Sequence, residues 1–114
     1  VYIENIMIIG ENKKTISALI VPAFPVLEIF CRDNGIDFSN REEMLQHPVV
    51  HKKFSRIRDG FNKRFSDVEK VKRFALLPAD WSIDTGELTP TLKMKRKFIM
   101  EKYKTYVADV YNED

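Results

Sequence analysis

Residues 6–22 read IMIIGENKKTISALIVP, two apolar runs that are separated by a short polar segment and closed by a proline. Runs of this length, rich in isoleucine and valine and joined by a short polar turn, are typical of a β-hairpin. Neither run alternates cleanly between apolar and polar residues, so we expect both strands to be largely buried. The stretch predicts a hairpin within a small sheet that other elements cover.

Signals for two short helices follow the hairpin. Pro25 suits the first turn of a helix, and Asn34-Gly35 fits its end. Ser39 and Glu42 form a capping-box pattern, which predicts a second helix from Ser39 to about Gln46.

A longer helical pattern begins at Val50. Apolar residues recur at spacings of 4, 3, 4, 4 and 3, which indicates one helix face formed by Val50, Phe54, Ile57, Phe61, Phe65 and Val68. Basic side chains fill its other faces, either as a solvated surface or as a binding surface for an acidic partner. We then expect a strand at 74–78, a loop at 79–91 and a last helix from Lys93 to Val110. This order predicts an α+β fold, in which the hairpin and one further strand form a small sheet covered by helices.

Composition bounds the class of protein. The 114 residues fit one domain, and 19 basic residues nearly balance 17 acidic ones, which argues against a nucleic-acid partner. The single cysteine, Cys31, excludes an internal disulfide, weakly favours a reducing compartment and is expected to be a small buried hydrophobe. Because the chain starts at Val1 in a strand-like pattern, we interpret it as a piece of a larger protein.

Two histidines and one tryptophan are weaker candidates for a site. His47 and His51 are four residues apart, but Pro48 lies between them and no third ligand has a zinc-motif spacing, so we predict no metal site. We expect Trp81 to pack against the body of the domain rather than to stack on a ligand.

The strongest candidate is the cationic stretch at 93–97, KMKRK, where a loop passes into a helix. Cations at a helix N-terminus are disfavoured by roughly 0.3–1 kcal/mol each. Local rules are broken more often at functional sites than elsewhere. A lysine ammonium on a loop suits phosphate and developing negative charge, and a solvated basic patch is the alternative interpretation.

The stretch 88–97, LTPTLKMKRK, resembles the last motif of the adenylate-forming enzyme superfamily. The form with GELTPT before the lysine is similar to that of long-chain fatty-acid–CoA ligases. Residues 65–77 and 18–22 resemble the same branch, so the resemblance covers nearly the whole chain. It implies that residues 1–114 are the mobile C-terminal lid domain of an AMP-forming acyl-CoA synthetase, without the N-terminal adenylate-binding domain and the hinge.

The resemblance also implies an activity for the parent enzyme. Such a ligase activates a fatty acid with ATP and Mg²⁺ to an acyl-adenylate, and then transfers the acyl group to CoA. Most of the binding surface for these substrates would lie in the N-terminal domain, which is the expected partner of this chain, and the fragment alone is expected to be inactive. We expect a cytoplasmic location. Peripheral membrane association stays open, because long-chain substrates partition into bilayers while no convincing amphipathic anchor is present.

By its position in the motif, Lys93 is implied to be the catalytic lysine of the adenylation half-reaction. Lys95, Arg96 and Lys97 either contact CoA phosphates or are solvated. Many superfamily members have glycine before this lysine, whereas Leu92 stands here and leaves less backbone freedom. A non-catalytic binding or regulatory module that retains the lid fold is the alternative function.

Overall fold

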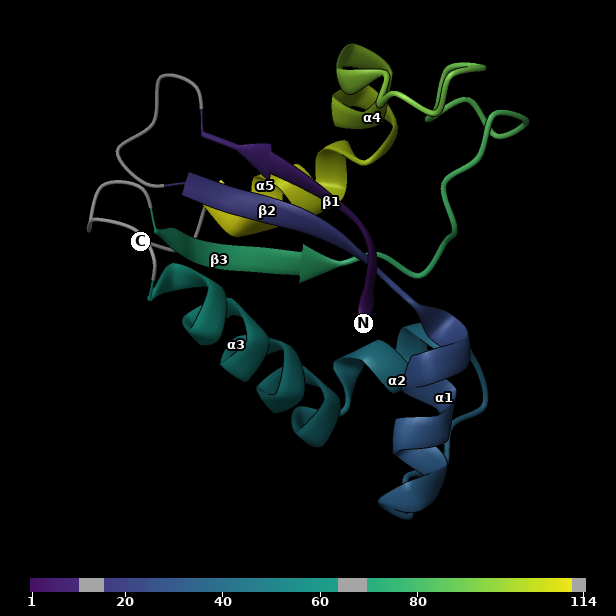
Figure 1. Cartoon of the computed structure of the whole chain (residues 1–114), viewed down its shortest axis with the longest axis vertical. Coiled ribbons are helices and arrows are strands. Elements are labelled where there is room, and N and C mark those ends of the chain that lie inside the picture. Colours follow the sequence, from purple (N-terminus) through teal and green to yellow (C-terminus); the bar gives the residue numbers. More distant parts are fainter. Residues whose placement is uncertain (11–15, 64–69, 112–114) are drawn as a thin grey trace.

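The computed structural model describes residues 1–10, 16–63 and 70–111. Three strands form one sheet in the order β1-β2-β3 (Figure 1). β1 (Ile3–Ile9) pairs antiparallel with β2 (Ile16–Pro22), which confirms the predicted hairpin, although residues 11–15 lie outside the described part. β3 (Val71–Leu76) pairs parallel with β2 on its other side.

The burial of each strand follows from this order. β2 is central, and it is buried from Ser17 to Pro22 because both of its faces are covered. β1 is an edge strand in which Met7 and Ile9 are buried while Ile8 is exposed. The prediction of a largely buried strand is therefore confirmed for β2 and wrong for β1, which alternates near its end.

Three helices connect β2 to β3: α1 (Phe24–Asp33), α2 (Arg41–Gln46) and α3 (Pro48–Asn62). The predicted signals for α1 are confirmed, since Pro25 lies in its first turn and Gly35, just after it, has a left-handed φ of 67°.

The N-cap of α2 is displaced by one residue from the prediction. The side chain of Asn40, not of Ser39, accepts a hydrogen bond from the amide of Glu43 (2.8 Å). The Glu43 carboxylate in turn accepts from the amide of Ser39 (3.2 Å). Two adjacent residues that can both cap a helix, serine and asparagine, explain why the sequence pattern misplaced the start.

The predicted long helix is wrong at its C-terminal end. α3 stops at Asn62, and Val71 begins β3 instead of extending the helix. The carboxamide of Asn62 donates to the carbonyl of Val71 (2.7 Å) and accepts from its amide (2.9 Å), so these two residues are paired side chain to backbone. Phe65 and Val68, which the apolar spacing placed on the helix, lie outside the described residues.

The last predicted helix is divided into α4 (Arg96–Lys102) and α5 (Lys104–Tyr111). The interruption falls at Tyr103, whose φ is −107°, and neither proline nor glycine marks it in the sequence.

Helices cover both faces of the sheet (Figure 1). Phe54 of α3 lies against the face that carries Ala18 and Ile20, whereas α5 crosses the opposite face and buries Val110. The α+β prediction is confirmed. No helix in the described ranges is long and apolar enough to cross a membrane.

Candidate active-site loop

Lys93 lies in a small hairpin formed by residues 88–94. The sequence predicted that the last helix begins at Lys93, whereas α4 begins at Arg96. Leu88 and Met94 form an antiparallel bridge, and the amide of Thr89 donates to the carbonyl of Lys93 (2.8 Å). The hairpin therefore holds the Lys93 backbone in a defined place, on a loop that comes before α4.

The tip of the hairpin requires an unusual backbone conformation at Leu92. The amide of Leu92 donates to the carbonyl of Thr89 (2.7 Å), which closes a turn with Pro90 at its second position. Leu92 then takes a left-handed φ of 64°, as the residue after such a turn does in three-residue hairpin loops. Glycine adopts this conformation freely, whereas a residue with a Cβ is disfavoured by roughly 1–2 kcal/mol.

Two substitutions at Leu92 test this conformation. We expect Leu92→Gly to stay within about 0.5 kcal/mol of the parent stability, because relief of strain offsets the greater freedom of glycine in the unfolded chain. Leu92→Val should lower stability by about 1 kcal/mol, since β-branched residues tolerate positive φ poorly. The Leu92 side chain is 67% exposed, so little packing is lost in either variant. Urea denaturation measures both, and equal stability of the two variants would contradict the assigned strain.

A buried carboxylate, Glu87, anchors the base of this hairpin. Its side chain is fully buried and accepts hydrogen bonds from the Tyr103 hydroxyl (2.6 Å), the Lys102 ammonium (2.8 Å) and the Thr85 hydroxyl. The carbonyl of Glu87 also accepts from the amide of Lys95 (2.8 Å). Glu87 thus joins the hairpin, the preceding turn and the junction of α4 and α5.

These contacts set the protonation state of the anchor. Burial alone would raise the pKa of Glu87, but the hydrogen bonds from Lys102, Thr85 and Tyr103 outweigh it and lower the pKa from 4.5 to about 2. Burial and the neighbouring carboxylate raise the pKa of Tyr103, which therefore stays a hydrogen-bond donor. The anchor is an ionised acceptor at neutral pH.

Gly86 lies directly before Glu87, in the turn that precedes the hairpin. Its φ is 98°, and a Cβ placed on it would lie 2.7 Å from Cζ of Phe98. The backbone conformation favours glycine here, and a Cβ would also force the partly exposed Phe98 ring to shift.

Gly86→Ala is accordingly expected to lower stability by about 2 kcal/mol, from strain at positive φ and from the clash with Phe98. Phe98→Ala in the same background removes the clash and leaves only the backbone strain. Denaturation of the two single variants and the double variant separates these contributions. Simple additivity of the two changes would show that the ring does not press on residue 86.

The Lys93 side chain is exposed and makes no hydrogen bond or ion pair with any residue in the described ranges. Lys93 borders an open hollow of about 500 Å³ between the hairpin and the edge of β1. Arg96 lines the same hollow, and Glu4 and Asn5 line it from β1. An anion or another protein surface can therefore approach Lys93 from solvent.

The other three cations of the cluster are not gathered at one point. Lys95 is the N-cap residue of α4, and its ammonium lies 5.5 Å from the centre of the Phe98 ring. Arg96 faces the hollow with Lys93, whereas Lys97 is exposed and is not among the residues lining it. The structure therefore brings Arg96, but not the whole cluster, to the Lys93 hollow.

The weaker candidates have structural roles. His47 caps α3 by accepting from the amide of Val49 (3.1 Å), and His51 stacks on Phe74 with ring centres 5.0 Å apart. Cys31 and Trp81 are buried, as predicted, and the indole lies 6.2 Å from the Tyr103 ring. In the described ranges no cluster of three His, Cys, Asp or Glu side chains could hold a metal ion.

Sequence reasoning missed the anchor of the loop. Glu87 lies within the recognised motif, yet a single acidic residue in a polar loop gives no sign that it is buried. Its partners Lys102 and Tyr103 are 15 and 16 residues further along the chain. The adjacency of β1 to the hairpin was missed for the same reason, because both are long-range contacts.

Comparison with known proteins relates the chain to one enzyme group. No protein-family model matches it. Over 105 residues, 92% of this chain, it is 30% identical to a putative fatty-acid–CoA ligase, fadD11, of Mycobacterium tuberculosis. Over 127 residues, 96% of this chain, it is 27% identical to the human long-chain-fatty-acid–CoA ligase ACSBG2. A shorter match, 43% identical over 53 residues and 46% of this chain, is to the long-chain-fatty-acid–CoA ligase FadD15 of M. tuberculosis.

The chain covers 18%, 19% and 9% of these three relatives, so it spans less than a fifth of the length of each. Among solved structures it is similar to the adenylation domain of a carboxylate reductase from Mycobacterium chelonae, with a TM-score of 0.67 and 16% identity. That match covers 98% of this chain and 16% of the other, and it shows a shared fold. The expected resemblance is confirmed: this chain is a homologue of part of the long-chain fatty-acid–CoA ligases and has a fold found in an adenylation domain.

Proposed function

We propose that the chain is the C-terminal lid domain of an AMP-forming long-chain fatty-acid–CoA ligase, and that Lys93 assists the adenylation half-reaction. The observation that carries this proposal is the Lys93 hairpin. Its base is fixed by the buried Glu87, while the Lys93 ammonium is exposed and has no partner within the described part of the chain. A cation held in this way is available to a site supplied by another domain.

The proposed chemistry requires such a cation. The fatty-acid carboxylate must attack the α-phosphate of ATP, and both groups are anionic. A fixed ammonium between them offsets their repulsion and stabilises the charge that develops in the transition state. A loop is a suitable carrier, because the lysine has to enter and leave the site as a lid moves.

The remaining requirements fall to the N-terminal domain that this chain would cover. ATP, its Mg²⁺ ion, the fatty acid and CoA would be bound mostly there, since the described residues offer no cluster of carboxylates for a metal. Arg96 faces the Lys93 hollow and is placed to meet a phosphate, of the nucleotide or of CoA. Lys95 and Lys97 could reach CoA phosphates only from other sides of α4. We also propose that the enzyme is cytoplasmic and that any association with membranes is peripheral.

Three proteins test the assignment of the chain as a lid: the ligase that contains it, the same ligase without residues 1–114, and the 114-residue chain alone. We expect acyl-CoA formation only by the first, because the lysine and the nucleotide site are on different domains. Acyl-CoA formation by the isolated chain would contradict the proposal, and so would full activity of the truncated ligase.

A further inference from the structure

Thr89 directs three polar groups at the arm of the hairpin that carries Lys93. Its amide donates to the Lys93 carbonyl (2.8 Å), and its carbonyl accepts from the Leu92 amide (2.7 Å). Its hydroxyl accepts from the Lys93 amide (3.0 Å). The first two contacts use backbone groups, which any residue except proline would supply. The third contact needs the side chain, so it is the one that the sequence specifies at this position.

The geometry of the turn explains why a hydroxyl is needed. In a β-turn the carbonyl of the first residue accepts from the amide of the fourth. Thr89 and Leu92 are these two residues, so the Thr89 carbonyl is already engaged. No backbone carbonyl in the described ranges accepts from the amide of Lys93, and the Thr89 hydroxyl takes that place. A residue without a hydroxyl would leave the Lys93 amide to water.

These contacts fix the direction of the Lys93 side chain. Each peptide unit is planar, so hydrogen bonds to the Lys93 amide and carbonyl hold the two planes that meet at its Cα. The orientation of these planes determines where the Cα–Cβ bond points. The exposed side chain then leaves the hairpin in one direction, beside the hollow of about 500 Å³ that it borders. Without the hydroxyl, only the carbonyl side of Lys93 is held.

We propose that Thr89 is a positioning residue for the adenylation half-reaction, and that its hydroxyl sets the direction from which the Lys93 ammonium approaches the reacting groups. This inference rests on the function proposed above for Lys93. A misplacement of about 1 Å can lower a rate by about a hundredfold, so a lysine held in one direction is more effective than one that samples several. Thr89 acts through Lys93, not on the substrates.

Amide NMR of the 114-residue chain tests the geometric part of the proposal. Thr89→Val keeps the branched shape without the hydroxyl, and Thr89→Ser keeps the hydroxyl. We expect the Lys93 amide to exchange with solvent several-fold faster in the valine variant and at the parent rate in the serine variant. Equal protection of this amide in the valine variant would overturn the inference and leave the proposed role of Lys93 untouched.

The kinetic part uses the proposed parent ligase, with adenylation and transfer to CoA assayed separately. Thr89→Val should lower kcat of adenylation by about tenfold and change KM for ATP and the fatty acid little, because the contact matters in the transition state. Transfer from preformed acyl-adenylate should be retained, and Thr89→Ser should restore adenylation. A role in folding alone would lower the active fraction and reduce both steps together, and that result would overturn the inference.

A double-mutant cycle with Lys93→Ala shows whether Thr89 acts through the lysine. We expect Thr89→Val to have no further effect on adenylation once residue 93 is alanine. The same loss in both backgrounds would overturn the inference. If Lys93→Ala lowers adenylation and Thr89→Val does not, this inference alone fails. If Lys93→Ala has no effect, the proposed function fails and this inference fails with it.

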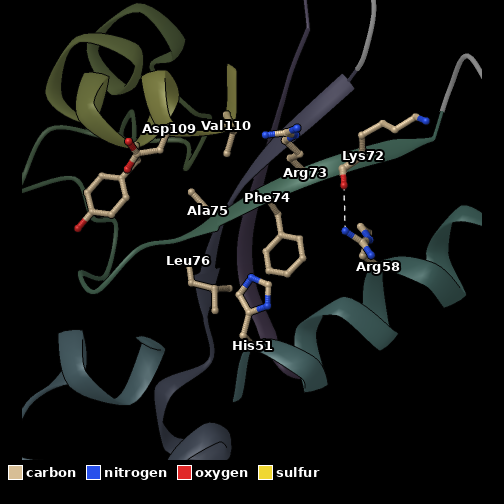
Figure 2. Close-up of a pocket in the computed structure, with 10 residues that line it drawn as sticks. His51, Arg58, Lys72, Arg73, Phe74, Ala75, Leu76, Asp109 and Val110 are labelled. Carbon is tan, nitrogen blue, oxygen red and sulfur yellow. Dashed lines mark hydrogen bonds between the residues drawn. The ribbon is translucent and has the colours of Figure 1, made fainter. Parts of the chain in front are cut away.

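Two control variants separate this hydroxyl from other polar contacts. Thr91→Val removes the hydroxyl 3.1 Å from that of Thr89 but keeps the acceptor of the Lys93 amide. Arg58→Gln removes a side chain that bonds a backbone group outside the hairpin, because its guanidinium donates to the Lys72 carbonyl (2.9 Å; Figure 2). We expect both variants to stay within about twofold of the parent rate of adenylation. A loss in either as large as in Thr89→Val would overturn the assignment to Thr89.

Discussion

Replacing Glu87 by glutamine is expected to lower the free energy of unfolding by about 2–4 kcal/mol, because it breaks a buried ion pair and leaves donors without a charged acceptor. The Tyr103 hydroxyl is buried with the carboxylate, and the Lys102 ammonium is partly exposed, which keeps the loss below that of a fully buried pair. The amides of Thr89 and Lys95, which are hydrogen-bonded at the base of the hairpin, should also exchange with solvent faster.

The same group predicts how stability depends on pH. The pKa of Glu87 is about 2 in the folded chain, lowered from its ordinary value of 4.5. A depressed pKa contributes stability that is complete above the unfolded value and is lost as the pH falls from about 5 toward 2. Denaturation curves across this range should therefore show that the free energy of unfolding falls with pH, and that it falls less in Glu87→Gln than in the parent chain.

A matched control for this variant is Glu101→Gln. The Glu101 side chain is 80% exposed and pairs with the exposed Lys104 at 3.6 Å, so its loss should cost less than about 0.5 kcal/mol. Equal effects of the two substitutions would mean that Glu87 does not anchor the loop.

The largest effect on activity is expected from Lys93→Ala. In the proposed parent ligase, acyl-CoA formation should fall by about a hundredfold or more, the scale expected for loss of one electrostatic contact to a transition state. Stability should not change, because Lys93 is exposed and has no partner in the described ranges. Lys97→Ala removes a charge four residues away that does not border the Lys93 hollow, and it should keep most of the activity.

Local patterns explain which parts of the fold could be predicted. The hairpin of β1 and β2, the proline at the start of α1 and the glycine after it are each specified by residues close together in sequence. The end of α3 could not be predicted in this way. It depends on pairing between Asn62 and Val71, while the apolar spacing continues past the end of the helix. Helical periodicity in the sequence therefore does not indicate where the helix ends.

The candidate site divides in the same manner. Lys93 was predicted from a contiguous motif, and the left-handed Leu92 explains why glycine is suited to that position. Glu87 was not identified, because its burial depends on partners from the junction of α4 and α5. A contiguous motif in the sequence can suggest an exposed residue such as Lys93, whereas the residues that hold its loop in place are visible only in the fold.

The central claim is that Lys93 acts in the adenylation half-reaction at a site on another domain. The most direct test is to assay the two half-reactions of the Lys93→Ala ligase separately. ATP-dependent formation of acyl-adenylate is measured in one assay, and transfer to CoA from preformed acyl-adenylate in the other. The account predicts that adenylation falls by about a hundredfold or more while transfer is largely retained. Retention of both steps at the parent level would show that Lys93 belongs to a solvated basic patch and would contradict the proposed function.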